Sequence, residues 1–206
     1  SVTIPSGGMG AYSPLYWAPD GIVEQTLKEV LNPTIQEMAA RGTPFIGLLY
    51  AGLSLTTHGI KVIEFNARFG DPETQVILPR LKTPLVQLLF AAATGALKNF
   101  GALEWRDESA VSVVLASKGY PETPIVGDEI TGIEERSDTE VFQAGTKVVD
   151  GKLRASGGRV LSVTGLGSDL TEARNRAYQS ISQITLSGSF YRSDIALNAS
   201  MAEKGN

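Results

Sequence analysis

The chain has 206 residues, of which 42% are hydrophobic and 19% charged, and this ordinary globular composition excludes disordered and collagen-like classes. The formal net charge of −4 argues against a broad nucleic-acid-binding surface, which requires clustered lysine and arginine. No apolar run approaches the roughly 20 residues that a membrane span needs. We therefore expect neither nucleic acid nor a membrane as a partner.

The absence of cysteine excludes disulfides, thiolate metal sites and cysteine nucleophiles, and it fits a reducing, cytoplasmic location. The single histidine, His58, lies in TTHGI, at the expected tip of a hairpin. That place favours a solvated turn residue over the base of a Ser-His-Asp mechanism. Because the chain starts at Ser1 with neither an initiator methionine nor a signal peptide, we expect it to be a piece of a longer protein.

The first elements expected after a glycine-rich start are two helices. An aspartate cap and apolar spacing predict a helix over 20–31, and an Asn-Pro pair predicts a second over 33–41, closed by a glycine. Residues 44–55 and 60–68 are rich in strand-forming residues and are separated by TTHG. These two runs predict a β-hairpin.

Two further helices are expected to open at proline. Asp71, Pro72 and Glu73 are typical of the N-cap and the first two positions of a helix. A Thr-Pro pair gives the same start to a mostly apolar helix over 83–97. We expect this second helix to be largely buried.

The remainder of the chain predicts a small β-rich domain. Its strand-like runs, separated by turn residues, are 109–117, 140–149, 152–156 and 159–167. Ser168 is expected to cap a helix over 168–184, before an extended segment over 187–197. We expect an α+β protein with a boundary near Trp105, giving domains 1–104 and 105–206.

Successive side chains of a strand point to opposite sides, and this places a set of polar side chains on one side of the second hairpin strand. Glu64, Asn66 and Arg68 share that side, while Ile63 and Phe65 share the other. A carboxylate and an amide oxygen can converge on Mg²⁺, and an arginine can hold a phosphate. A metal ion and an arginine together suit phosphoryl transfer. The alternative is a Glu64–Arg68 surface ion pair worth about 0 to 1 kcal/mol, and the pattern leaves both open.

Two glycine-rich segments are weaker candidates for ligand contacts. SGGMG, residues 6–10, can cradle an anion with backbone N–H groups but lacks Walker or dinucleotide spacing. SGGRV, residues 156–160, lets the backbone approach a ligand closely beside Arg159. A flexible terminus and a plain hairpin turn are the respective alternatives. Asp71 is likewise either a helix cap or a ligand contact.

Several longer segments resemble one family of enzymes, the phosphoribosylamine–glycine ligases, which are ATP-grasp ligases of purine biosynthesis. The resemblance covers essentially the whole chain, in the same order and with approximately the same spacing. The segments are GGMGAYSP (7–14), LLYAGL (48–53), KVIEFNARFGDPETQ (61–75), SKGYP (117–121), VFQAGTK (141–147), GGRVLSVT (157–164) and YRSDIA (191–196). The combination of GGMGAYSP with EFNARFGDPE is the most specific.

The resemblance implies that this chain is the C-terminal half of a longer ligase. It would hold the last part of an ATP-grasp domain, followed by a small hybrid-motif-like β-rich domain. The N-terminal half would be its partner, and the isolated chain would be inactive. With ATP and Mg²⁺ or Mn²⁺, glycine would become glycyl phosphate. The amine of 5-phosphoribosylamine would then attack it, giving glycinamide ribonucleotide, ADP and phosphate.

The resemblance also implies roles for individual residues. Glu64 and Asn66 correspond to metal ligands. Arg68 would join them in binding ATP and would contact its phosphates or the acyl phosphate. Asp71 would lie near the glycine amine, so Arg68 and Asp71 are the catalytic candidates. The residues expected to bind substrate are Gly8, Asp71, Gly157, Gly158 and Arg159.

Some positions depart from the family pattern. LLYAGLSL lacks the additional metal-binding acid that many ATP-grasp enzymes carry on the partner strand. Gln143 stands where the family usually has histidine, and the tail differs at Ser193, Ala196 and Asn198. These departures bear on the contacts of the C-terminal domain more than on the family. Two other functions stay open. One is an ATP-grasp carboxylate–amine ligase with different substrates, and the other is a non-catalytic, ligase-derived binding module.

Overall fold

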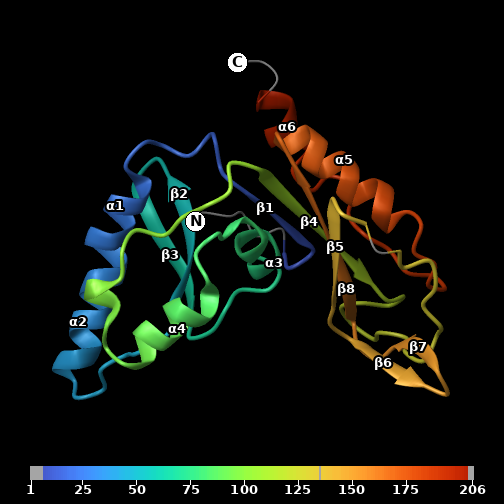
Figure 1. Cartoon of the computed structure of the whole chain (residues 1–206), viewed down its shortest axis with the longest axis horizontal. Helices are drawn as coiled ribbons and strands as arrows, with labels where there is room; N and C mark the ends of the chain where they lie inside the picture. The colour runs from blue at the N-terminus through green and yellow to red at the C-terminus, as the bar shows by residue number, and fades with distance from the viewer. Residues whose placement is uncertain (1–6, 135, 204–206) are drawn as a thin grey trace. The chain divides into compact units, whose positions relative to one another are not determined.

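The computed structural model describes residues 7–134 and 136–203, and contacts divide the chain into two compact units (Figure 1). The sheet unit contains the described residues of Ser1–Tyr16, Asp71–Arg80 and Arg106–Asn206. The hairpin unit contains Trp17–Gly70 and Leu81–Trp105. Both helices and strands are present, so the expected α+β class is confirmed.

The sheet unit is built on a four-stranded antiparallel sheet with the order β1-β4-β8-β5. The strands are β1 (Gly10–Ser13), β4 (Ser109–Ala116), β8 (Arg159–Gly167) and β5 (Thr139–Gln143). A separate two-stranded hairpin consists of β6 (Thr146–Val149) and β7 (Lys152–Ala155). The expected strands over 109–117, 152–156 and 159–167 are confirmed, whereas the run over 140–149 divides into two strands.

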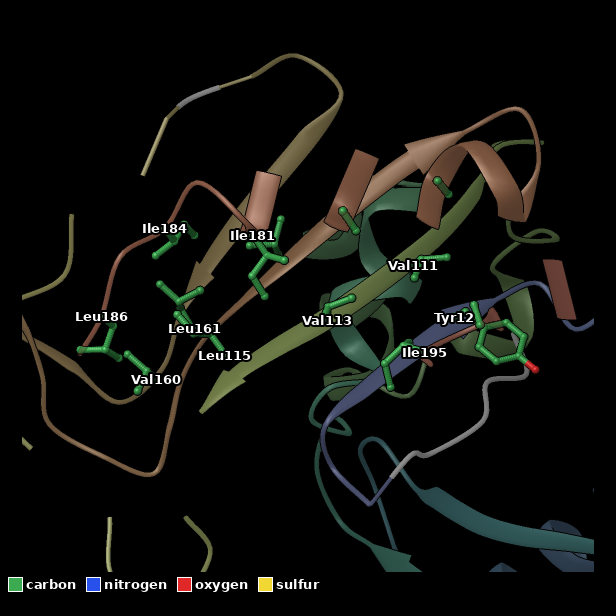
Figure 2. Packing of buried hydrophobic residues seen from close by; sticks show 14 of the residues in the cluster. Tyr12, Val111, Val113, Leu115, Val160, Leu161, Ile181, Ile184, Leu186 and Ile195 are labelled. Carbon is green, nitrogen blue, oxygen red and sulfur yellow. The ribbon is translucent and has the colours of Figure 1, made fainter. Parts of the chain in front are cut away.

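Helix α5 (Leu170–Ile181) packs on one face of this sheet. Figure 2 shows Val111 and Val113 of β4, Leu161 of β8 and Ile181 of α5 within this apolar core. Their alternate spacing along each strand is what one face of a sheet requires. Figure 2 also shows Tyr12 of β1 in the core, which therefore joins chain segments about a hundred residues apart.

The cap of α5 is one residue later than expected. The side chain of Asp169 accepts a hydrogen bond from the backbone N–H of Glu172 at 2.6 Å. Ser168 instead donates from its N–H and its hydroxyl to Oε2 of Glu172, at 2.7 and 2.8 Å. Both hydrogen bonds from Ser168 lower the pKa of Glu172, and the bond from the backbone N–H has the larger effect. The predicted Ser168 cap is therefore wrong, because the aspartate side chain takes that role.

The opposite face of the sheet carries α3 (Thr74–Ile77) and the 3₁₀ turn Leu78–Arg80. Val76 of α3 is fully buried against Ala11 of β1 and Ala110 of β4. Since Ala110 alternates with the core residue Val111, this packing is on the face away from α5. Residues 71–80 thus belong to the sheet unit.

Helix α3 begins later than the sequence predicts. The carbonyl of Glu73 accepts hydrogen bonds from Val76 and Ile77, both at 3.1 Å, so Glu73 is the N-cap residue. Asp71 and Pro72, joined by a cis peptide bond, lie in the preceding turn. The prediction that Asp71 is the N-cap is wrong, because its carboxylate bonds to side chains and not to the backbone of the first turn.

The hairpin unit contains β2 (Tyr50–Thr56) and β3 (Gly59–Asn66), which pair antiparallel and confirm the predicted hairpin. The expected helices before it are also present. Their segments are α1 (Ile22–Thr26), a π-helical turn (Leu27–Leu31) and α2 (Asn32–Ala40). The later part of the unit contains α4 (Leu85–Ala93) and a 3₁₀ turn (Leu97–Asn99).

The prediction that the apolar helix α4 is largely buried is wrong. Its only buried residue is Ala91, while the side chains of Val86 and Phe90 are 78% and 70% exposed. Apolar composition drives burial only where a partner surface exists. Within the described residues, no element covers these two side chains.

Two elements were not expected from the sequence. Strand β1 lies within the glycine-rich start, and α6 (Leu197–Glu203) follows the predicted extended segment and overlaps it only at Leu197. The expected boundary between 104 and 105 stays a prediction about family domains, since contacts follow a discontinuous division of the chain. No helix in the described part of the chain is long and apolar enough to cross a membrane.

Candidate functional site

The polar side of β3 holds the two expected metal ligands next to each other. Nδ2 of Asn66 donates a hydrogen bond to Oε1 of Glu64 at 3.1 Å. Ile63, on the other side, is 67% exposed. The alternation predicted for this strand therefore brings the carboxylate and the amide together.

Strand β2 leaves space for the carboxylate. Gly52 lies opposite Glu64 in the register, beside an irregularity between Gly52 and Leu53. A Cβ atom at Gly52 would lie 3.1 Å from Cγ of Glu64. The glycine therefore allows the Glu64 side chain its place over the partner strand.

The pair fits a hard divalent cation. Rotation of the Asn66 amide would present its oxygen beside the Glu64 carboxylate, giving two oxygen ligands of the kind that Mg²⁺ accepts. Among the described residues there is no cluster of three acidic or histidine side chains that could hold a metal. The remaining ligands would come from water, from ATP phosphates or from the part of the enzyme that lies outside this chain.

Arg68 follows β3 and is exposed. Its Nη1 donates to the carbonyl of Phe69 at 2.9 Å, and no ion pair joins it to Glu64 in the part of the chain that the structure describes. The ion-pair explanation of the Glu64–Arg68 spacing therefore finds no support in this arrangement. The guanidinium keeps N–H donors for an anion.

In the sheet unit, Arg159 makes three hydrogen bonds to two other expected site residues, Asp71 and Gly8. Its Nη2 donates to Oδ2 of Asp71 at 2.9 Å. Its Nη1 donates to the carbonyl oxygens of Asp71 and Gly8, both at 3.0 Å. We call this arrangement the Arg159 clamp.

Gly8 fits the clamp because it lacks a side chain. Its φ of +75° lies in the left-handed region, and a Cβ atom there would lie 2.8 Å from Nη1 of Arg159. The neighbouring Gly7 has a φ of +64°, but its Cβ would meet no atom within 4 Å. Of these two glycines, Gly8 is therefore the one that combines a left-handed backbone with a close approach to Arg159.

Gly157 and Gly158 allow close packing before β8. A Cβ atom at Gly158 would lie 2.4 Å from Cδ2 of Tyr120, and one at Gly157 would lie 3.1 Å from the Cα of Gly145. Ser117 donates from its N–H to the carbonyl of Gly158 at 2.8 Å. These glycines anchor the start of the strand that carries Arg159, and their expected contact with substrate stays a prediction.

Arg80 and Gln75 make hydrogen bonds that were not predicted from the sequence. Arg80 donates to the carbonyl of Glu108 and to Oγ of Ser13, both at 2.6 Å, and burial lowers its pKa. Gln75 donates from Nε2 to Oδ1 of Asp71 at 2.8 Å. The i, i+4 spacing from Asp71 to Gln75 was the available signal, whereas nothing in the LPR context marks Arg80.

A separate hollow of about 370 Å³ lies in the sheet unit between β1 and the segment 192–199. Arg192 and Asp194 line it and form an ion pair with distances of 2.7 and 2.9 Å. The hydrogen bond from Arg192 lowers the pKa of Asp194. The segment YRSDIA therefore borders a concave surface.

The expected site residues thus fall into two groups. Gly8, Asp71 and Arg159 meet in the sheet unit, where Gly157 and Gly158 precede Arg159. The other group lies on or directly after β3 in the hairpin unit and consists of Glu64, Asn66 and Arg68.

Comparisons with protein families give two matches from one family. Residues 3–74 match the phosphoribosylglycinamide synthetase ATP-grasp (A) domain. Residues 110–198 match the phosphoribosylglycinamide synthetase C domain.

Individual relatives agree with these matches. A phosphoribosylamine–glycine ligase of Streptomyces coelicolor is 56% identical over 96% of this chain and 49% of its own length. The one of Caulobacter vibrioides is 48% identical over 94% of this chain and 46% of its own length. The chain therefore spans about half the length of the curated relatives it matches.

Among solved structures, the phosphoribosylamine–glycine ligase of Thermotoga maritima has a TM-score of 0.80 and 34% identity. That match covers 91% of this chain and 46% of the Thermotoga chain. The urea carboxylase of Kluyveromyces lactis has a TM-score of 0.61 and 14% identity, covering 94% of this chain and 17% of its own. The second likeness shows the fold alone.

Proposed function

Since the chain belongs to the phosphoribosylglycinamide synthetase family, we propose that it is part of a ligase that joins glycine to 5-phosphoribosylamine at the expense of ATP. The relatives that support this carry the name phosphoribosylamine–glycine ligase and are about twice as long as this chain. The activity belongs to the complete enzyme, of which this chain supplies the later half. Purine biosynthesis in the cytoplasm is the proposed setting.

The observation that carries the proposal is the pair of Glu64 and Asn66 on one side of β3, with 3.1 Å between Oε1 and Nδ2. Phosphoryl transfer from ATP requires a metal ion that neutralises phosphate charge. Glu64 and Asn66 would hold Mg²⁺ or Mn²⁺, and that ion would offset the charge that develops on the ATP phosphates.

Arg68 would add a fixed positive charge for the transferred phosphoryl group. An oxygen of the glycine carboxylate attacks the γ-phosphorus, and ADP leaves. The amine of 5-phosphoribosylamine then attacks the carbonyl carbon of glycyl phosphate, losing a proton as phosphate leaves. In this reaction the protein mainly positions groups and neutralises charge.

Asp71 would bind the ammonium group of glycine. Its side chain is 45% exposed, and a carboxylate oxygen has room for more than one hydrogen bond. The expected substrate contacts of Gly8, Gly157 and Gly158 would then come mainly from backbone groups, because these residues have no side chain.

The test is Glu64→Gln in the complete enzyme that contains this chain. The variant keeps the shape and removes the charge, so we expect activity at saturating ATP to fall about a hundredfold and to require more Mg²⁺. Glu37→Gln, which alters an exposed acid that forms an ion pair with Arg41, is the matched control. A Glu64→Gln enzyme with wild-type activity and Mg²⁺ dependence would refute the metal assignment.

A further inference from the structure

The Arg159 guanidinium donates hydrogen bonds to protein groups of the sheet unit. Its three hydrogen bonds end on Gly8 and on two oxygens of Asp71, at 2.9 to 3.0 Å. Two of these acceptors are main-chain carbonyls, which the clamp ties to the beginning of β8. An arginine that binds a phosphate or carboxylate of a ligand turns its planar fork towards that ligand. Here the fork is turned towards Asp71.

The clamp fixes the orientation of the Asp71 carboxylate. Oδ2 accepts from Arg159 at 2.9 Å, and Oδ1 accepts from Nε2 of Gln75 at 2.8 Å. Both oxygens are therefore held, from opposite ends of the carboxylate, by side chains of the same compact unit. The Asp71 side chain is 45% exposed and is held in one orientation, which is what recognition of an ammonium group requires.

The backbone around the clamp is built so that the guanidinium fits. Met9, next to Gly8, is buried against Val114 and Ala116 of β4. Behind Arg159, Gly158 lies under Tyr120 too closely for any side chain. The clamp therefore joins two packed backbone segments, while the Arg159 side chain itself stays 30% exposed.

We infer that Arg159 is a positioning residue that orients Asp71 for the ammonium group of an amino-acid substrate, and that it does not itself bind a substrate anion. The inference rests on the proposed function for the identity of that substrate, glycine. Arg159 then acts on the substrate through Asp71 and does not contact the substrate directly.

The test compares Arg159→Met, Asp71→Asn and the double variant in the complete enzyme. Each single change should raise the KM for glycine about tenfold to a hundredfold, because each disturbs a charged hydrogen bond at the same carboxylate. The KM for 5-phosphoribosylamine should stay within about threefold. The double variant should bind glycine no more weakly than Asp71→Asn alone, because both act through one group.

Arg159→Lys gives a second reading. Lysine keeps the charge but cannot donate to three acceptors from one plane, so the KM for glycine should stay raised. Wild-type glycine binding in this variant, a raised KM for 5-phosphoribosylamine, or multiplied effects in the double variant would each overturn the inference in favour of a direct anion contact.

Gly8→Ala disturbs the same clamp without replacing Arg159. The added Cβ would meet Nη1 of Arg159, so the rise in the KM for glycine should reappear. Gly7→Ala is the matched control, since it has a similar positive φ and no atom within 4 Å of the added Cβ. An equal rise in both variants would overturn the clamp, because backbone strain alone would then explain it.

Failure of the proposed function is distinguishable from failure of the clamp. Unfolding of this chain in urea needs no substrate, and the Arg159 and Asp71 changes should be coupled there too. Additive effects on unfolding would overturn the clamp. The effects on unfolding could be coupled while ADP release by the wild-type enzyme does not depend on glycine. That result would support the clamp and overturn the assigned substrate.

Discussion

The two compact units differ most in how they bury apolar side chains. The sheet unit has a continuous core between α5 and the sheet, in which Leu161, Val163 and Ala177 are at most 1% exposed. Among the described residues of the hairpin unit, the buried apolar side chains are those of Val30 and Ala91. Ile46 and Val86 there are 72% and 78% exposed. Burial of apolar side chains therefore stabilises the sheet unit much more than it stabilises the hairpin unit.

The largest expected effect comes from matched leucine truncations in the two units. Leu161→Ala in β8 should lower the free energy of unfolding by about 2 to 5 kcal/mol, because it leaves a cavity in the core. Leu89→Ala in α4, where the side chain is 44% exposed, should cost less than about 1 kcal/mol. Urea unfolding of each variant measures both changes. Equal losses would contradict the contrast between the units.

A smaller effect is expected at two aspartates that both precede helices. Asp169→Ala removes the side-chain cap of α5 in the sheet unit and should cost about 1 kcal/mol. Asp20→Ala in the hairpin unit should change stability by less than about 0.5 kcal/mol, since α1 has Gly21 at its N-cap and no side-chain cap bond. Thermal unfolding separates the two, and a larger loss for Asp20→Ala would reverse the assignment of caps.

The smallest effect concerns the exposed Arg192–Asp194 pair of the sheet unit. Since the bond from Arg192 lowers the pKa of Asp194 in the folded state, the pair contributes stability above the unfolded pKa. That contribution is lost as the pH falls through the lower, folded value. Arg192→Gln should move the pKa of Asp194 back towards its ordinary range, as an NMR titration of the carboxyl carbon would show. An unmoved titration would mean that the pair does not set this pKa.

Local patterns predicted much of the secondary structure because hairpins and capped helices depend on neighbouring residues. The β2–β3 hairpin and strands β4 and β8 follow from alternation and turn residues. Strand β1 could not be found in this way, since its partner β4 lies about a hundred residues away along the chain. The exposure of Val86 was equally hidden, because composition shows that a helix is apolar and not what covers it.

The candidate site was predicted unevenly for the same reason. Glu64 and Asn66 lie together because a period of two places them on one side of a strand, which the sequence itself shows. The contact between Arg159 and Asp71 joins residues 88 positions apart. A spacing rule cannot predict that contact. It depends on residues 71–80 packing on the sheet that begins with β1.

The measurement that tests the central claim most directly is ADP release by the complete enzyme, with ATP and Mg²⁺. Glycine and 5-phosphoribosylamine would be supplied separately and together. The proposed ligase predicts that sustained release requires both substrates. Release with glycine and a different amine would instead indicate another ATP-grasp ligase. No release under any combination would contradict the ligase assignment and leave a non-catalytic module derived from this family.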